Sequence, residues 1–206
     1  MPLITISRQY GSGGSDVAER VARALGWRLY DNDVVEEVAA RMGVSAAEVW
    51  AREERVPSLV ERVSAAISLG SPEVMPALGD VARPSEERMV EVTQRVIEDA
   101  VRAGPAVLVG RGAQCMLAER GDALHVYCYA PTDWMIRRVA SELGVSPDVA
   151  RERVHDINHQ RADYVRRHWN RDWRDVANYD LCLNTARVGL EGAAELIVAT
   201  ARSQFG

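Results

Sequence analysis

Apolar and polar positions alternate in some stretches of the chain and recur at helical spacing in others. Residues 3–7 alternate and are rich in β-branched side chains, which predicts a strand. Residues 106–110 form a continuous apolar run, which is typical of a strand covered on both faces. Further strands are predicted for the segments WRLYD, ALHVYCYA and YDLCLNT.

Helical spacing of apolar positions separates these strands. Val17, Val21 and Leu25 recur every four residues, and Gly26 can end the helix that they predict. Further helices are predicted near residues 32–42, over most of residues 44–104, over a long polar stretch at residues 133–173 and near residues 190–202.

Strands that alternate with helices predict an α/β fold, in which a parallel sheet is covered by helices on both faces. The length of 206 residues suits one domain, residues 1–206, with room for a helical insertion at residues 44–104 and a lid at residues 133–175. Ligands of such sheets bind beyond the carboxyl ends of the strands, so we expect the functional residues just after each strand.

Composition and charge argue against several classes of protein. A hydrophobic fraction of 47% is enough for a core, and the net charge of −5 argues against a general nucleic-acid binder. No apolar run reaches the roughly 18 residues of a membrane span, and the first residues lack the pattern of a signal peptide. Cys115, Cys128 and Cys182 are scattered singly, as in proteins of a reducing compartment. We therefore expect a cytoplasmic protein without a membrane or nucleic-acid partner.

A glycine-rich segment, RQYGSGGS at residues 8–15, joins the first predicted strand to the first predicted helix. Glycines permit conformations in which successive N–H groups point at one anion, and the helix adds the positive end of its dipole. In the motif G-x-x-x-x-G-K-[ST], the second glycine and the hydroxyl fall at Gly13 and Ser15. Arg8 and Gly14 stand at the positions of the first glycine and the lysine. An ordinary glycine-rich turn is the alternative.

The predicted role of this loop is to bind nucleotide phosphates, with Ser15 as a ligand of Mg²⁺. The candidate nucleotide-binding residues are Gly11, Ser12, Gly13, Gly14, Ser15 and Asp16. All 25 basic residues of the chain are arginines, so no lysine elsewhere can replace the absent one. Arginine supplies the same charge with more donors. The candidate catalytic arginines are Arg8 at the start of the loop and Arg137, Arg161 and Arg166 in the predicted lid.

Two further candidates follow other strands. Asp31 comes after the second strand, where a carboxylate can orient an acceptor or reach a metal through water, although it can equally cap the next helix. Arg111 comes after the most apolar strand, where a charge must be paired. Its planar fork suits a phosphate, and a structural ion pair is the alternative.

The predicted lid is rich in arginine. Residues 151–175 hold seven arginines against five carboxylates in an otherwise acidic chain. Arginines that close over a transferring phosphoryl group neutralise charge in its transition state. A solvated, salt-bridged helix is the alternative.

Several motifs of the chain resemble those of the cytidylate kinase-like proteins, a branch of the P-loop nucleoside monophosphate kinases that tends to lack the motif lysine. The segments that carry the resemblance are ITISRQYGSGG, VLVGRGA and NYDLCLNT. The resemblance implies a three-layer αβα fold. It matches Arg111 to an arginine that holds the acceptor phosphate and Asp31 to the aspartate of D-T-G. Gly112 stands where the family has the aspartate of G-R-D. Asn158 replaces the first aspartate of D-x-x-R and is a candidate substrate ligand.

The resemblance also implies an activity. We expect transfer of the γ-phosphoryl group of ATP, with Mg²⁺, to a nucleoside monophosphate, with CMP or dCMP as first candidates. The departures at residues 14 and 112 keep open a nucleotide-binding protein without turnover. The length of the predicted insertion at residues 44–104 keeps open a kinase of a metabolite or antibiotic hydroxyl.

Overall fold

A five-stranded parallel sheet forms the centre of the molecule in the computed structural model, which describes residues 1–31 and 86–206. The strands run in the order β2-β3-β1-β4-β5, and each pairs with its neighbours in parallel. Their bounds are β1 (Leu3–Arg8), β2 (Arg28–Tyr30), β3 (Ala106–Val109), β4 (Ala123–Tyr129) and β5 (Leu181–Asn184). The predicted parallel α/β sheet is confirmed.

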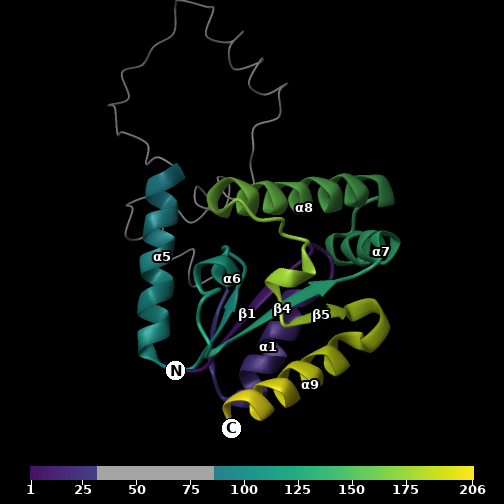
Figure 1. Ribbon diagram of the computed structural model, residues 1–206. Helices are drawn as coiled ribbons and strands as arrows, with labels where there is room; N and C mark the ends of the chain where they lie inside the picture. Colours follow the sequence, from purple (N-terminus) through teal and green to yellow (C-terminus); the bar gives the residue numbers. More distant parts are fainter. Residues whose placement is uncertain (32–85) are drawn as a thin grey trace, which may run out of the picture.

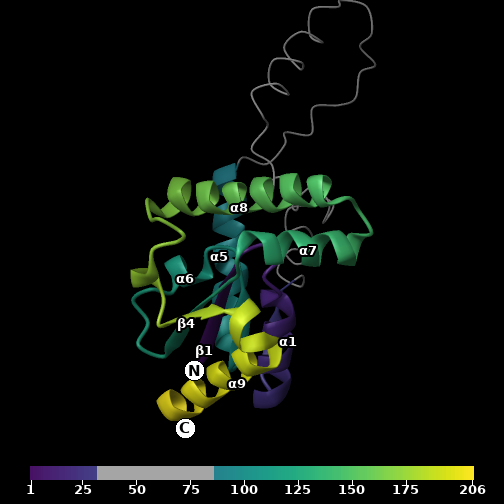
Figure 2. The same cartoon turned by 90° about the vertical axis from the view of Figure 1, so that its right-hand side faces the viewer.

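Helices cover both faces of this sheet and its carboxyl end. One face carries α1 (Gly14–Leu25) and α9 (Thr185–Phe205), and the other carries α5 (Glu86–Ala103) and the short α6 (Ala113–Met116). Figures 1 and 2 show α7 (Thr132–Leu143) and α8 (Pro147–Trp169) side by side beyond the carboxyl ends of the strands. A 3₁₀ turn, Val176–Asn178, leads into β5.

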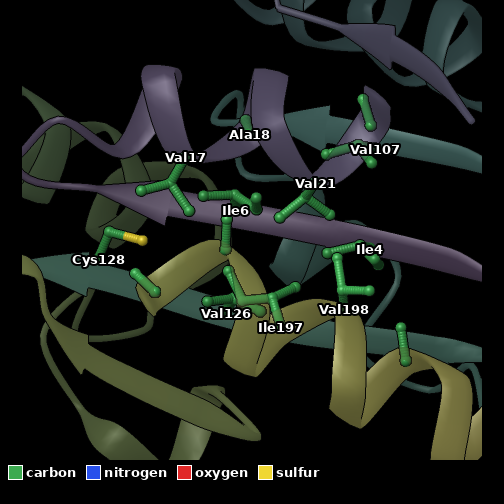
Figure 3. Packing of buried hydrophobic residues seen from close by; sticks show 14 of the residues in the cluster. Ile4, Ile6, Val17, Ala18, Val21, Val107, Val126, Cys128, Ile197 and Val198 are labelled. Carbon is green, nitrogen blue, oxygen red and sulfur yellow. The ribbon is translucent and has the colours of Figure 1, made fainter. Parts of the chain in front are cut away.

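The core lies on the two faces of the sheet because successive side chains of a strand point in opposite directions. Ile4 and Ile6 of β1 pack with Val17 and Val21 of α1 and with Ile197 of α9 (Figure 3). The opposite face of the same strands, which includes Leu3 and Leu108, packs against Ile97 of α5. All four residues of β3 are buried, which explains its continuous apolar run.

Two predicted helices have different bounds in the structure. The stretch at residues 133–173 is two helices, because Gly144 adopts a φ of +63° at the end of α7 and Ser146 caps α8 by accepting from the Val149 N–H group at 3.4 Å. The last helix begins at Thr185, with a kink at Gly189. The predicted end of α1 at Gly26 is confirmed.

The predicted helix near residues 32–42 and most of the predicted insertion at residues 44–104 lie outside the described residues, apart from α5. In residues 1–31 and 86–206, none of the helices has the length and apolar character needed to cross a membrane.

Candidate active site

The loop between β1 and α1 is held from three sides. The Gln9 side-chain oxygen accepts from the Ala130 N–H group after β4, at 3.2 Å. The buried Asn158 of α8 accepts from the Tyr10 N–H group at 2.7 Å. The Thr185 hydroxyl, at the start of α9, donates to the Ser12 carbonyl at 2.7 Å. The loop backbone is therefore held in place by side chains of this chain alone.

The N–H groups that can reach an anion belong mainly to the first turn of α1. Gly13 precedes the helix with a φ of +74°, and the Val17 N–H group is bonded to the Gly13 carbonyl at 3.1 Å. The N–H groups of residues 14–16 precede that first helical hydrogen bond and point out of the helix end. They lie at the positive end of the helix dipole, next to the loop.

Ser12 differs from the other predicted loop ligands. Its N–H group donates to the Gln9 carbonyl at 3.1 Å, and its buried hydroxyl donates to the same carbonyl at 2.7 Å. Both donors of Ser12 are thus used beneath the loop. The structure therefore places the Ser12 donors within the tight turn and not in the lining of the loop cavity. Its role as a nucleotide ligand stays a prediction.

A cavity of about 350 Å³ lies over the loop. The predicted nucleotide-binding residues other than Ser12 line it. Three arginines and several carboxylates line it beside them. These residues include Arg8, Gly11, Gly13, Gly14, Ser15, Asp16, Asp31, Arg138, Glu142 and Arg161. We call this space the loop cavity.

Arg8 extends from the end of β1 across the carboxyl ends of β3 and β2. Its side chain passes against Gly14 and reaches Gly110, which follows β3. Its Nη2 atom lies 3.4 Å from Oδ1 of Asp31, which follows β2, and both side chains are largely buried. The Arg8 carbonyl accepts from Nη1 of Arg161 at 2.9 Å. The structure therefore brings together three of the predicted site residues, Arg8, Asp31 and Arg161.

A second cavity of about 60 Å³ shares two of its lining residues, Arg8 and Arg161, with the loop cavity. Its wall includes Arg111, Tyr164 and Trp173. We call this space the small cavity. Because Arg8 and Arg161 line both cavities, a group bound in either cavity lies next to these two arginines.

Arg111 is presented by a strained turn. Gly110, Arg111 and Gly112 have φ values of +72°, +59° and +67°, so three consecutive residues are left-handed. This conformation costs a residue with a side chain roughly 1–2 kcal/mol. Such strain persists where the surroundings hold it, and it is concentrated at functional sites.

The surroundings of Arg111 are unfavourable for its positive charge. Burial, followed by the positive charge of Arg8, lowers the pKa of Arg111 to about 10, while Tyr164 and Asp31 act in the opposite direction. The group is still charged at neutral pH. A bound anion would relieve both unfavourable effects, because it interacts with the two guanidinium groups together.

The arginines of the predicted lid separate into two groups. Arg161 faces the cavities, but Arg166 is exposed and bonds Asp163 on its own helix at 2.5 Å. Arg137 is exposed and lines neither cavity. The structure therefore does not bring Arg137 and Arg166 to the site, because they lie on the outward faces of α7 and α8.

Arg138, next to Arg137 in the sequence, is the site residue that sequence reasoning missed. It bonds Asp16 at 2.8 Å and Glu142 at 2.6 Å, and it lines the loop cavity. The periodicity of α7 contains the signal. Met135 and Val139 are buried against Gly11, and a residue three positions after Met135 lies on that same face.

Comparison with known proteins places this geometry in a family. Residues 3–187 match the model of the cytidylate kinase-like family. The chain belongs to this family.

The similarity to known proteins extends over nearly the whole chain. A cytidylate kinase of Ignicoccus hospitalis is 26% identical over 200 residues, which are 96% of this chain and 97% of the relative. The structure of an uncharacterised protein from Eubacterium ventriosum aligns over 98% of this chain and 99% of that chain, with a TM-score of 0.72 and 19% identity. A shikimate kinase from Bacteroides thetaiotaomicron aligns over 98% of both chains with a TM-score of 0.56 and 13% identity, which supports the fold alone.

Gly112 is the clearest structural departure of this chain from the expected family motif. A Cβ atom at this position would overlap the ring of Trp169, the last residue of α8. An aspartate therefore does not fit while the indole lies there. Trp169 also contacts the ring of Tyr164, with centroids 5.4 Å apart, and Trp173 is buried beside Tyr127. Membership of a branch without the motif lysine stays a prediction.

Proposed function

We propose that this protein transfers the γ-phosphoryl group of ATP, with Mg²⁺, to a nucleoside monophosphate, with CMP and dCMP as the first candidates. The observation that carries the proposal is that Arg8 and Arg161 line both the loop cavity and the small cavity. Phosphoryl transfer needs positioning and charge neutralisation more than a covalent group from the protein.

The residues of the loop cavity fit the phosphates of ATP. The first-turn N–H groups of α1 and the helix dipole suit an anion, and the loop is already tied to β4, α8 and α9. Arg138 is well placed to contact phosphate from α7, since its guanidinium carbon lies 3.4 Å from the point where a Gly13 Cβ atom would be. Its ion pairs with Asp16 and Glu142 hold it there.

The oxygens that line the loop cavity also fit Mg²⁺. In phosphoryl-transfer sites this ion takes one or two protein oxygens, with phosphates and water completing its shell. Ser15 and the carboxylates of Asp16 and Asp31 line the cavity. Ser15 is the proposed direct ligand, because its position matches the hydroxyl of the motif.

Arg111 is the residue proposed to bind the phosphoryl acceptor. Its guanidinium can bind the acceptor phosphate from the small cavity, while Arg8 and Arg161 neutralise charge on the group in transfer. Asp31 stays beside Arg8 and keeps that side chain directed toward β3. Asn158, a predicted substrate ligand, is instead proposed to act through the loop, because its side chain bonds the Tyr10 N–H group.

A coupled assay of ADP release across nucleoside monophosphates and small alcohols tests the function. CMP or dCMP is expected to raise ADP release well above the rate with ATP alone. Arg161→Ala should lower kcat by about 10²–10³-fold, as loss of a transition-state donor does, whereas Arg137→Ala on the outward face of α7 is the matched control. Tight ATP binding with no acceptor-dependent ADP release would favour a nucleotide-binding protein without turnover.

A second candidate function is a kinase of a small anionic metabolite that carries a hydroxyl group. The overlap between Gly112 and Trp169 favours it, because no side chain at residue 112 can contact a pyrimidine base. The same assay separates the two candidates. ADP release with hydroxy acids and none with nucleoside monophosphates would support the metabolite kinase.

A further inference from the structure

Arg8 and Gly14 share one space. A Cβ atom built on Gly14 would overlap the Cβ atom of Arg8 and would lie 2.9 Å from its Cγ atom. Non-bonded carbon atoms prefer separations of about 3.5–4.0 Å, so Gly14 cannot gain a side chain while Arg8 keeps its own. The contact involves the first carbon of each side chain and is not relieved by a change of rotamer.

The same two positions are exchanged in the common phosphate-loop motif. In G-x-x-x-x-G-K-[ST] a glycine stands at the position of Arg8 and a lysine at that of Gly14. In this chain, the contact means that a side chain at either position requires glycine at the other, and the motif has the same pairing in reverse.

We infer that residues 8 and 14 form an exchange pair, in which Arg8 carries the cation of the phosphate loop and Gly14 makes room for it. The inference deepens the proposed function and rests on it for the identity of the bound phosphates. It selects Arg8 among the four predicted arginines.

The Arg8 side chain reaches groups that the motif lysine, which starts from the helix, would not be expected to reach. Its Nη1 atom fills the space where a Gly110 side chain would be, and its Nη2 atom is directed to Asp31. A lysine at residue 14 would start from helix α1, whereas this guanidinium starts from β1 and reaches the small cavity. Arg8 can therefore contact a phosphate in the loop cavity and the group that approaches from Arg111.

A double-mutant cycle tests the exchange pair through ATP affinity and kcat. Arg8→Gly is expected to lower kcat by about 10²–10³-fold. Gly14→Lys alone should also be defective, because Arg8 blocks the new side chain. The double variant Arg8→Gly with Gly14→Lys should recover at least about tenfold of the loss in Arg8→Gly, since it restores the motif cation.

Thermal unfolding tests the steric part without any activity. Gly14→Ala should lower the melting temperature when residue 8 is arginine or alanine, because both keep a Cβ atom. The loss should be much smaller when residue 8 is glycine, where a contact of 3.2 Å with the Cβ atom of Cys128 remains. Gly192→Ala is the matched control. It lies in helix α9, and among the described residues its added Cβ atom would meet Val188 alone, at the ordinary distance of 3.9 Å.

The outcomes separate this inference from the proposed function. If the wild type binds ATP but transfers nothing, the proposed function fails, and the cycle is still read in ATP affinity and melting temperature. The exchange pair is overturned if Gly14→Ala costs the same stability in all three backgrounds. It is also overturned if the double variant binds ATP no better than Arg8→Gly. Should Gly14→Lys fail to fold, the Gly14→Ala series decides the question.

Discussion

Two strand-to-helix turns of this protein follow neighbouring strands and offer an anion different groups under the proposed function. The β1–α1 loop is tied down by side chains from β4, α8 and α9, and it leaves the first-turn N–H groups of α1 exposed to the loop cavity. The β3–α6 turn, residues 110–112, has three left-handed residues and presents one side chain, Arg111.

The difference shows that backbone and side-chain anion sites need different support. N–H groups are useful only when the loop is held in one conformation, so the β1–α1 loop requires several distant tethers. The guanidinium of Arg111 does not depend on several aligned N–H groups. Burying it next to Arg8 is costly, however, and the turn adds backbone strain. The β1–α1 loop is thus expected to be stabilised by its contacts. The β3–α6 turn is instead held by its surroundings in a backbone conformation that Arg111 disfavours.

The largest effect should come from Arg111→Gly. Acceptor kcat/KM should fall by about 10²–10³-fold through loss of a charged donor, while the free energy of unfolding should rise by about 1–2 kcal/mol because glycine accepts the left-handed conformation. Steady-state kinetics and urea unfolding measure the two. Asn170→Gly, which changes the other left-handed residue with a side chain, should leave acceptor kinetics unchanged. A less stable Arg111→Gly protein would contradict the view that this turn is strained.

Gly112→Ala should have the next largest effect. The new Cβ atom meets both an unfavourable φ and the ring of Trp169, so the variant should lose about 1–3 kcal/mol more stability than Gly26→Ala, through overpacking. Gly26 has the same φ of +67°, and no heavy atom of the described residues lies within 4 Å of its added Cβ atom. The excess should shrink in a Trp169→Ala background. Equal losses at residues 112 and 26 would exclude the indole as the cause.

Asn158→Leu should have an intermediate effect, and it tests whether the hydrogen bonds that hold the β1–α1 loop matter for ATP binding. It leaves the Tyr10 N–H group without its acceptor, which costs about 1–3 kcal/mol for a buried group. ATP affinity should weaken more than acceptor affinity, because the loop loses its link to α8. Asn158→Asp keeps an accepting oxygen and should behave much as the wild type in calorimetry. If both variants lose ATP binding equally, the tether is not what matters at this position.

The smallest effect is expected from Arg166→Ala. Arg166 is exposed and bonded to Asp163 on the same helix, and such surface pairs contribute about 0–1 kcal/mol. Stability and kcat should therefore stay close to those of the wild type. A large loss of kcat would mean that α8 rotates during turnover and brings this residue inward.

Much of the site could be predicted because its chemistry lies at strand ends, which local patterns locate. Arg8, Asp31 and Arg111 follow strands that alternation and apolar runs identify, and the parallel sheet then brings them to one edge. Arg137 and Arg166 were less predictable, because a helix rich in arginine on several sides does not reveal which side faces the sheet. For α7, the packing of Met135 and Val139 on Gly11 shows which side faces the loop and selects Arg138.

The sequence alone determined the parallel sheet, the glycine-rich loop and the absence of lysine, because periodicity, glycine content and composition are local properties of the chain. Tertiary structure decided what those features do. The overlap of residues 8 and 14, the indole over Gly112 and the bond from Asn158 to the loop all join positions that are distant along the chain or lie across a turn. Such contacts depend on atomic separations, which follow only from how the helices and strands pack.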